Sequence, residues 1–378
     1  MPGIAFFSNG LWVLVLALLG PSVPSIVTDL GISYTQAGLF FTFLSFGSLL
    51  GTSLGAFATD HFNRKRIFIV STLCLVAGLI VTALSRTYYL LLAAIFLMSM
   101  LGSPIGAVSQ SVMLSLFPQK RESYLSLQTF FAASGSFMSP LIVTAVLLLG
   151  FPWRASFLFA ALLGLVLLVF AFRLQIPPMQ TPPDEEKQRT ARLLKDPALI
   201  VSALFIFLSI GPDIGFSYWL TEHFLTDLGA EKRWAAAIVT IYLSGILFGR
   251  GILPRILRVH PGVRVIPFAA ATAIAGFAGF RFLEPILLKT LSVCVYGIGV
   301  APIFPLLMAW GTGRFPGNPG TATGILFGAM SLGGMVFPVL IGRIAEDFGI
   351  PGGYFLNVAI LLFFLVFFGL KARKKRDS

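Results

Sequence analysis

Apolar runs of about 20 residues recur along the whole chain, and no other feature limits its fold as strongly. We count twelve such runs, at residues 5–28, 36–58, 67–85, 89–116, 124–149, 155–174, 198–222, 235–253, 265–282, 286–310, 320–345 and 354–370. Each run can cross the hydrocarbon core of a bilayer as a helix. Backbone groups in lipid must be bonded within the protein, so the sequence predicts an all-α membrane protein with twelve transmembrane helices. Only 11% of the residues are charged, which excludes an ordinary soluble domain.

The two halves of the sequence repeat each other at a spacing of 198 residues. Most of the matching residues are glycine or proline, which set turns, kinks and close helix approaches. The matches are Thr28-Asp29-Leu30-Gly31 with Thr226-Asp227-Leu228-Gly229, Gly47 and Gly51 with Gly245 and Gly249, Pro104 with Pro302, Phe117-Pro118 with Phe315-Pro316, and Gly135 and Pro140 with Gly333 and Pro338. This pattern predicts two pseudo-symmetric six-helix bundles, an arrangement that many transporters use.

A long polar stretch at residues 175–197 separates the two halves. It contains two proline pairs and a mixture of charges, which is typical of a solvated linker. We therefore predict an N-terminal bundle at 1–174, a cytoplasmic linker at 175–197, and a C-terminal bundle with a short basic tail at 198–378.

Basic residues are distributed unevenly between the two sides of the predicted membrane. If both termini are cytoplasmic, 20 of the 27 Lys and Arg residues lie in cytoplasmic segments and 7 lie on the outer side. The net charge of +12 then reflects membrane orientation, and we expect the bilayer rather than nucleic acid as its partner. The N-terminus has no basic region or cleavage site, so we expect no signal peptide.

The cysteine and histidine residues give no sign of a metal site. Cys74 and Cys294 lie in separate apolar runs, and His61, His223 and His260 lie at the ends of runs. We therefore expect no disulfide framework, metal or other cofactor.

The seventh apolar run carries one acidic residue at membrane depth. Asp213 follows Gly211 and Pro212 within residues 203–223. A carboxylate in hydrocarbon is costly and normally faces a protein interior or a wet cavity. A glycine–proline pair is expected to break the helix here, as in solute and ion pathways. The alternative is a structural Asp213 bonded to a neighbouring helix.

The loop after the second run resembles a signature of the major facilitator superfamily. Residues 55–66 contain Asp60 and the basic run Arg64-Lys65-Arg66, similar to Gly-x-x-x-Asp-Arg-x-Gly-Arg-Arg. Ala56, His61 and Asn63 depart from that pattern. The resemblance implies a gating role for Asp60 and Arg64, with Asp60 facing the helix that starts near Gly320. The alternative is simple pairing of Asp60 with Arg64.

Three further stretches are similar to the fucose permease branch of sugar–proton symporters. They are Leu125 to Gly135, Gly211 to Trp219, and Gly299 to Pro305 with Gly333-Gly334 and Pro338. Gln128 stands where this branch commonly has His, and Asp213 stands where it has Glu. Proton-coupled members carry carboxylates in the first half, whereas runs one to six here have none at membrane depth. Asp213 is therefore the single candidate for proton coupling.

Polar and aromatic residues at membrane depth are candidates for binding a polar solute. Asn9 and Trp12 share one helical face, and so do Tyr124 and Gln128. The full set is Asn9, Trp12, Gln110, Tyr124, Gln128, Asp213, Tyr218, Trp219, Tyr242, Tyr296 and Asn357. The alternatives are interfacial anchoring for the aromatic residues and helix–helix bonding for the amides.

Charged residues at the ends of the runs are candidates for gates. Arg250 ends the eighth run and occupies the second-half counterpart of the loop signature, so it is either a gate residue or a snorkelling cation. Glu222, His223 and Arg343 lie on the outer side, where they form either an outer gate or a solvated rim.

These features predict a secondary active transporter that moves a small polar solute by alternating access. A sugar-like solute and proton coupling are the options that the resemblance suggests, and no enzyme-like constellation is present. The alternative is an efflux transporter for drugs or lipids, which the 38 phenylalanines would suit. We expect a monomer in a bacterial inner membrane, with both termini cytoplasmic.

Overall fold

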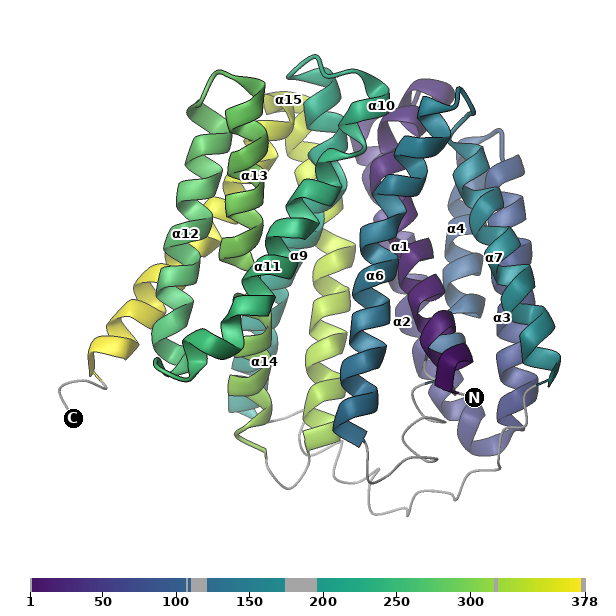
Figure 1. Cartoon of the computed structure of the whole chain (residues 1–378), viewed down its shortest axis with the longest axis horizontal. Coiled ribbons are helices and arrows are strands. Elements are labelled where there is room, and N and C mark those ends of the chain that lie inside the picture. The colour runs from purple at the N-terminus through teal and green to yellow at the C-terminus, as the bar shows by residue number, and fades with distance from the viewer. Residues whose placement is uncertain (1, 107, 110–120, 174–195, 316–318, 375–378) are drawn as a thin grey trace. The chain divides into compact units, whose positions relative to one another are not determined.

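The chain folds into helices that are divided between two compact units. The structure, a computed structural model, describes residues 2–106, 108–109, 121–173, 196–315 and 319–374 (Figure 1). Unit 1 contains Met1–Pro183 and Glu231–Ala237, and unit 2 contains Asp184–Ala230 and Ile238–Ser378. The division after residue 183 falls within the predicted linker 175–197. Most of that linker lies outside the described residues, so the predicted domain limits 1–174 and 198–378 stay predictions.

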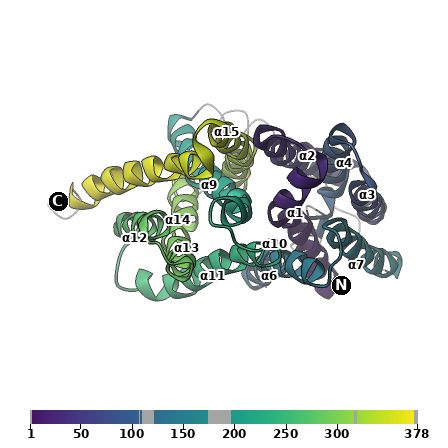
Figure 2. The same cartoon turned by 90° about the horizontal axis from the view of Figure 1, so that it is seen from above.

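Unit 1 is a bundle in which helices far apart in the sequence pack together. Its helices are α1 (Pro2–Leu30), α2 (Tyr34–His61), α3 (Arg64–Leu84), α4 (Tyr88–Gly102), α6 (Arg121–Leu148), α7 (Arg154–Arg173) and the short α10 (Lys232–Ala235). Helix α1 packs against α6, α2 against α4, and α3 against α7. Figure 2, which looks along the helices, shows α1 beside α6 and α3 beside α7.

Unit 2 repeats this plan with the second half of the chain. Its helices are α9 (Pro197–Thr226), α11 (Ile238–Leu257), α12 (Gly262–Phe282), α13 (Ile286–Val300), α14 (Ile303–Thr312) and α15 (Pro319–Lys374). Helix α9 packs against α15 as α1 packs against α6, and α11 packs against α13 as α2 packs against α4. Among the described residues, eleven helices are long and apolar enough to cross a membrane, and α15 contains two of the predicted spans.

The predicted repeat appears as the same helix contacts in each unit. An added Cβ at Gly47 on α2 would overlap backbone near Phe96 on α4, and one at Gly245 on α11 would overlap the carbonyl of Cys294 on α13. Phe96 and Cys294 are themselves 198 residues apart. Both glycines are therefore required by close approach of backbones rather than by special dihedral angles.

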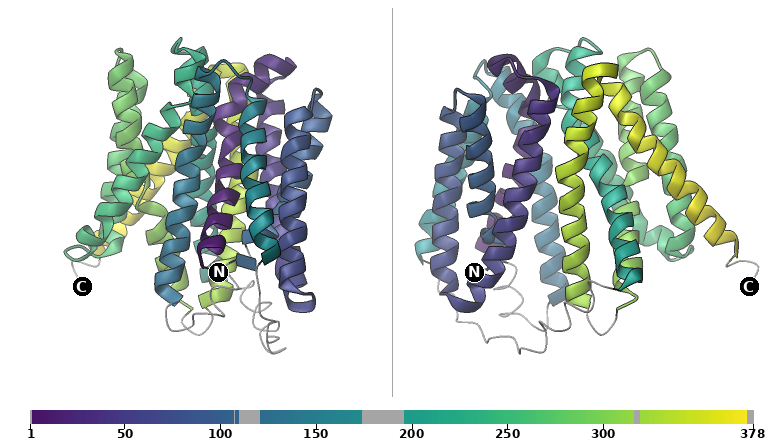
Figure 3. Two further views of the ribbon diagram at one scale, coloured as in Figure 1. Left: turned by 45° about the vertical axis from the view of Figure 1, so that its right-hand side comes forward. Right: turned by 180° about the vertical axis from the view of Figure 1, so that it is seen from behind.

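Helix α15 combines the predicted spans 320–345 and 354–370, and its reversal is confined to one residue. Gly349 has φ 70° and ψ 166°, a conformation outside the helical region that favours glycine. Figure 3 shows α15 reversing direction between its two long segments. With α15 counted as two spans, the described helices account for twelve spans, which confirms the predicted fold class.

The predicted spans 89–116 and 286–310 are not continuous helices in the structure. Helix α4 ends at Gly102, one residue before the turn at Ser103 that precedes Pro104. Helix α13 ends at Val300, and α14 begins after Pro302. Proline lacks a backbone donor and its ring crowds the preceding turn, so both interruptions occur at the matched prolines of the repeat.

The predicted break at Gly211-Pro212 is wrong, because α9 runs without interruption through both residues. An added Cβ at Gly211 would lie 2.9 Å from the Cα of Gly333 on α15, so the two helices nearly touch here. The carbonyl of Pro212 also accepts a hydrogen bond from the side chain of Asn357 on α15. Close packing on α15 supports the helix at its proline, and the Asn357 donor bonds the Pro212 carbonyl to α15.

Candidate functional site

The membrane-depth carboxylate of unit 2 is bonded to a tyrosine of a neighbouring helix. Asp213 lies on α9 in a half-buried position, and the hydroxyl of Tyr242 on α11 donates a hydrogen bond to its Oδ1. Tyr242 is 1% exposed. A hydrogen bond to an ionised acceptor is among the stronger ones, so this pair holds the carboxylate in place within an apolar bundle.

A second polar pair, formed by α13 and α15, is bonded to the residue that precedes Asp213 on α9. The Nδ2 of Asn357 on α15 donates to the Tyr296 hydroxyl on α13 at 2.9 Å and to the Pro212 carbonyl at 2.9 Å. An amide nitrogen has two hydrogens, so both are used. The Oδ1 of Asn357 is buried and has no hydrogen-bond partner among the described residues. It is an acceptor that a water or a solute hydroxyl could fill.

Phe216 joins these polar groups into one cluster. It follows Asp213 by three residues on α9, and its ring centroid lies 4.4 Å from that of Tyr296, 4.7 Å from Tyr354 and 5.6 Å from Tyr242. Stacked and edge-on rings at such distances are mutually stabilising. We name Asp213, Phe216, Tyr242, Tyr296, Tyr354 and Asn357 the tyrosine cluster.

A small cavity borders the tyrosine cluster. Its lining includes Pro212 and Asp213 on α9, Ile303 and Phe304 on α14, and Asn357 on α15. Its volume is about 20 Å³, which is room for roughly one water molecule. Beside the carboxylate, unit 2 by itself therefore has room for about one water molecule and not for a sugar.

Unit 1 contains a smaller polar group built on α1 and α6. The Nδ2 of Asn9 donates to the backbone carbonyl of Gln128 at 3.0 Å. The Gln128 side chain is 6% exposed, and its Oε1 has no hydrogen-bond partner within the described part of the chain. Trp12, one turn after Asn9, is buried beside Gly102 and Gly106, where an added Cβ would lie 3.2 Å and 3.6 Å from its ring. The structure thus brings Asn9, Trp12 and Gln128 together.

Two further predicted aromatic ligands follow the tyrosine cluster's Asp213 and Phe216 on α9. Trp219 is fully buried, and its Nε1 donates to the Pro338 carbonyl on α15 at 2.8 Å. This bond joins α9 to α15 and satisfies the indole donor. Tyr218 is half-buried on the preceding position of α9. A solute-binding role for either residue stays a prediction.

Several predicted residues cannot be placed in the site. Gln110 and the side chains of Tyr124 and Asp60 lie outside the described residues. Arg64, the other predicted gate residue beside Asp60, is 3% exposed at the start of α3. Arg250 is exposed. The prediction that it ends its helix is wrong, because α11 continues to Leu257. The gating roles therefore stay predictions.

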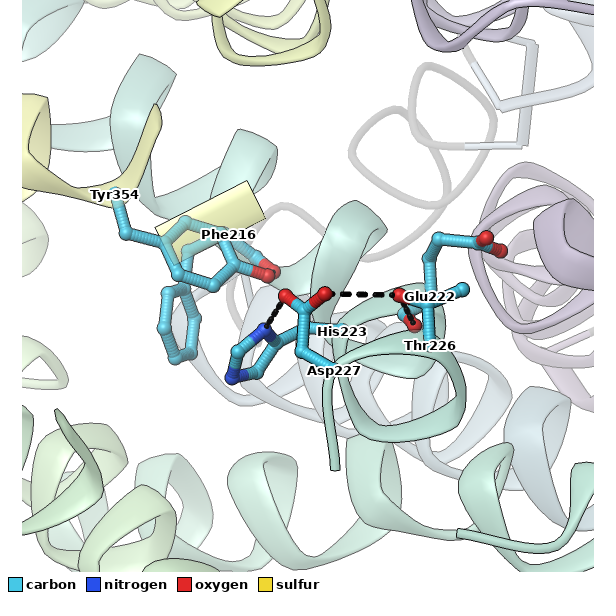
Figure 4. Close-up of polar contacts among 6 residues, drawn as sticks. All are labelled: Phe216, Glu222, His223, Thr226, Asp227 and Tyr354. Carbon is cyan, nitrogen blue, oxygen red and sulfur yellow. Dashed lines mark hydrogen bonds and ion pairs between the residues drawn. The ribbon is translucent and has the colours of Figure 1, made fainter. Parts of the chain in front are cut away.

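The charged residues that were predicted to lie on the outer side separate into a buried group and an exposed group. His223 and Glu222 are only 5% and 3% exposed, so a solvated rim is wrong for these two. The Nδ1 of His223 lies 2.6 Å from an oxygen of Asp227 one turn later (Figure 4). By contrast, Arg343 is exposed and pairs with Glu346 at 2.8 Å along the surface of α15.

Phe216 and Tyr354 are cluster residues that the sequence did not single out. Phe216 lies three residues after Asp213, and Tyr354 lies three residues before Asn357. Helical spacing from each polar residue was therefore the available signal. Figure 4 shows Tyr354 beside Phe216, close to the His223–Asp227 pair.

Comparison with known proteins finds relatives that match almost the whole chain. Sodium-dependent glucose transporter 1A of Mus musculus is 24% identical over 89% of this chain and 87% of its own length. Inner membrane transport protein YdiM of Escherichia coli K12 is 23% identical over 98% of this chain and 93% of its own.

Solved structures show the same fold. A variant of the nucleoside transporter NupG superposes with a TM-score of 0.81 at 17% identity, covering 97% of each chain. A D-xylose–proton symporter superposes with a TM-score of 0.79 at 16% identity, covering 97% of this chain and 96% of its own. The Major Facilitator Superfamily profile matches residues 5–327. The chain therefore belongs to the major facilitator superfamily and is a multi-pass membrane transporter rather than an enzyme.

Proposed function

We propose that the protein is a secondary active transporter that moves a small, hydroxylated solute by alternating access and couples this movement to protons through Asp213. The observation that carries the proposal is the bond between Asp213 and Tyr242 beside a water-sized cavity. An ionisable group at membrane depth is costly and is usually retained for function. A carboxylate that has a phenolic donor on one side and room for a water molecule on the other can gain and lose a proton without disrupting the bundle.

Each unit by itself carries a buried amide that offers a hydrogen-bond acceptor to a solute. Asn357 and Gln128 each leave a buried carbonyl oxygen without a partner among the described residues. Such oxygens are acceptors for solute hydroxyl groups, and the neighbouring rings of Tyr296 and Trp12 suit the CH faces of a sugar. Relatives and solved neighbours are named for glucose, xylose and nucleosides, which share a hydroxylated ring. We therefore infer a sugar-like or nucleoside-like solute.

Transport by the purified protein in proteoliposomes tests this function. A panel of labelled glucose, xylose, a uronate and a nucleoside is offered with a proton gradient, with a sodium gradient, or with neither. We expect proton-driven accumulation of one class. The Asp213→Asn variant should lose accumulation but keep exchange of the solute across the membrane, because exchange needs no net proton movement.

A matched control is available on the same helix. Asp196 is the N-cap of α9 and accepts from the backbone of Ala198 at 2.8 Å, a role that asparagine fills equally well. Asp196→Asn should therefore accumulate solute like the wild type. Normal proton-driven accumulation by Asp213→Asn would refute the coupling role. Export of drugs without uptake of any polar solute would refute the proposed function and support the alternative of an efflux transporter.

We infer a bacterial inner-membrane location with both termini in the cytoplasm, and a monomer as the working unit. The uneven distribution of Lys and Arg and the inner-membrane name of one relative support the location. The monomer rests on the presence of both six-helix units in one chain. Reporter enzymes fused after Ser378 test the orientation, and light scattering of the detergent-solubilised protein tests the monomer.

A further inference from the structure

Unit 2 has a groove at one end of its bundle that the transport function does not use. Its volume is about 810 Å³, far larger than the cavity at Asp213. The walls come from α11, α12, the break between α13 and α14, and the last turns of α15. Ile252, Ile256, Val265 and Ile298 are among the lining residues, so much of its surface is aliphatic.

The groove lies where helices of unit 2 end. Ile256 is in the last turn of α11, Arg264 is in the first turn of α12, and Arg373 is in the last turn of α15. All three line the groove. Figure 1 shows these helix ends close to the C-terminus, on the side that the basic residues predict to be cytoplasmic. Helix ends of a membrane protein lie at the depth of the lipid headgroups.

The rim of the groove is basic, and no acidic residue is among the described residues that line it. His260, Arg264 and Arg373 line it, and neither arginine has an ion-pair partner among the described residues. The sequence from Ile238 to Leu283 contains no Asp or Glu. Two uncompensated arginines at one end of a greasy groove complement an anion that carries an apolar chain.

The apolar part of the groove extends away from this rim along α12. Phe268, one turn after Arg264, lines the groove and is 75% exposed. Thr272, one turn further, donates its hydroxyl to the Phe268 carbonyl at 2.9 Å and so needs no ligand. An exposed phenylalanine at this depth is stable only against hydrocarbon. The groove therefore changes from cationic at the helix ends to apolar toward the membrane centre.

We propose that this groove binds an anionic glycerophospholipid of the cytoplasmic leaflet. The headgroup phosphate lies between Arg264 and Arg373, and an acyl chain lies along Ile256, Phe268 and Thr272. The cytoplasmic leaflet supplies anionic lipids, and basic clefts between helices on that side are suited to their headgroups. The site is independent of solute transport and uses none of the residues assigned to it.

Lipid binding to the full-length protein in detergent tests the site. Native mass spectrometry compares phosphatidylglycerol with phosphatidylcholine of the same acyl chains. We expect the wild type to retain one phosphatidylglycerol more tightly than phosphatidylcholine. Arg264→Gln and Arg373→Gln should each weaken the binding of phosphatidylglycerol roughly fivefold, since one cation near the membrane surface contributes about this factor to the affinity. The double variant should bind roughly 30-fold more weakly.

A steric variant tests the groove without changing its charge. Gly369 lines the groove, and an added Cβ would meet nothing within 4 Å, so the side chain of Gly369→Phe starts in open space and occupies part of the groove. Gly251 on α11 is equally open but does not line the groove. Gly369→Phe should lose the lipid, whereas Gly251→Phe and the outer-side charge control Arg281→Gln should bind as the wild type does.

Three outcomes would overturn the proposal. The first is equal binding of phosphatidylcholine and phosphatidylglycerol by the wild type, which would show that the groove is apolar but does not select an anionic headgroup. The second is unchanged phosphatidylglycerol binding in both the double arginine variant and Gly369→Phe. The third is stronger lipid binding after Asp184, Glu185 and Glu186 are neutralised, because the acidic linker would then be the occupant.

Discussion

The hydroxyl of Tyr242 on α11 donates a hydrogen bond to the carboxylate of Asp213 on α9, and this bond connects α11 to the membrane-depth acidic residue of unit 2. The ring centroids of Phe216 and Tyr242 lie 5.6 Å apart, so packing holds the Tyr242 ring in position independently of its hydroxyl group. The bond and the ring packing can therefore be separated by mutation.

Tyr242→Phe removes the hydroxyl group and keeps the ring. We expect the variant to fold, with a free energy of unfolding that is lower by about 1.5–3 kcal/mol because a charged acceptor loses its donor. Proton-driven accumulation should fall while solute exchange persists, so that this variant lies between the wild type and Asp213→Asn. Uptake in proteoliposomes measures both quantities.

The matching control for Tyr242 is another buried tyrosine of the tyrosine cluster. Tyr354 contacts the backbone carbonyl of Phe216 at 3.4 Å, a long bond, and makes none to Asp213 in the described structure. Tyr354→Phe should therefore leave accumulation nearly unchanged. If Tyr354→Phe and Tyr242→Phe lose accumulation equally, the phenol of Tyr242 has no special connection to coupling.

Substitution of Gly245 tests the close approach of two helices that occurs within each unit. An added side chain there would overlap the Cys294 carbonyl, and this atom is backbone that cannot turn aside. Gly245→Val should destabilise the protein by at least about 3 kcal/mol, in the range of overpacked cores. Thermal unfolding in detergent measures the loss, and Gly251→Val, in open space, should cost less than about 1 kcal/mol. Equal effects at the two glycines would contradict close approach as the reason for Gly245.

The sequence predicted those parts of the fold that glycine and proline determine. The match between Gly47 and Gly245 anticipated close approaches, and the match between Pro104 and Pro302 marks the two interrupted spans. It failed at Pro212, because the continuity of α9 depends on Gly333 and Asn357, which are more than 100 residues away. No local pattern contains that contact.

The candidate site was harder to predict than the fold. A helix that is apolar all round has no amphipathic contrast, so nothing in the sequence distinguishes Phe216 in the core from a phenylalanine facing lipid. Trp219 was a candidate ligand because it follows Asp213 on the seventh run; its donor is bonded to the Pro338 carbonyl, and a solute-binding role for its ring stays a prediction. Buried tryptophans need such partners whatever their function.

Gln128 tests the contribution of unit 1 to solute binding. Its side chain is buried, and its Oε1 has no hydrogen-bond partner among the described residues, so it is free to accept from a solute hydroxyl. Gln128→Met keeps the length of the side chain and removes the acceptor. We expect the KM for the solute to rise about tenfold, because a hydrogen bond to a neutral group contributes about 1 kcal/mol and leaving a solute hydroxyl unpaired adds to the loss.

Ser134→Ala on the same helix is the control for this measurement, because Ser134 bonds only to its own helix backbone at Phe130 in the described structure. Its KM should match that of the wild type. If the Gln128→Met variant has the wild-type KM for every transported solute, the Gln128 amide does not bind the solute.

The His223–Asp227 pair is the last relationship that can be tested, and a double-mutant cycle isolates it. The two side chains lie one turn apart at the end of α9, 2.6 Å from each other, and the His223 ring also packs on Phe280 at 5.0 Å. His223→Gln, Asp227→Asn and the double variant separate the ion pair from the packing. Asp227 is partly exposed, so we expect a coupling of only about 0.5–1 kcal/mol in the free energy of thermal unfolding. A coupling of zero within error would show that the contact between the two side chains adds nothing to the packing of His223 on Phe280.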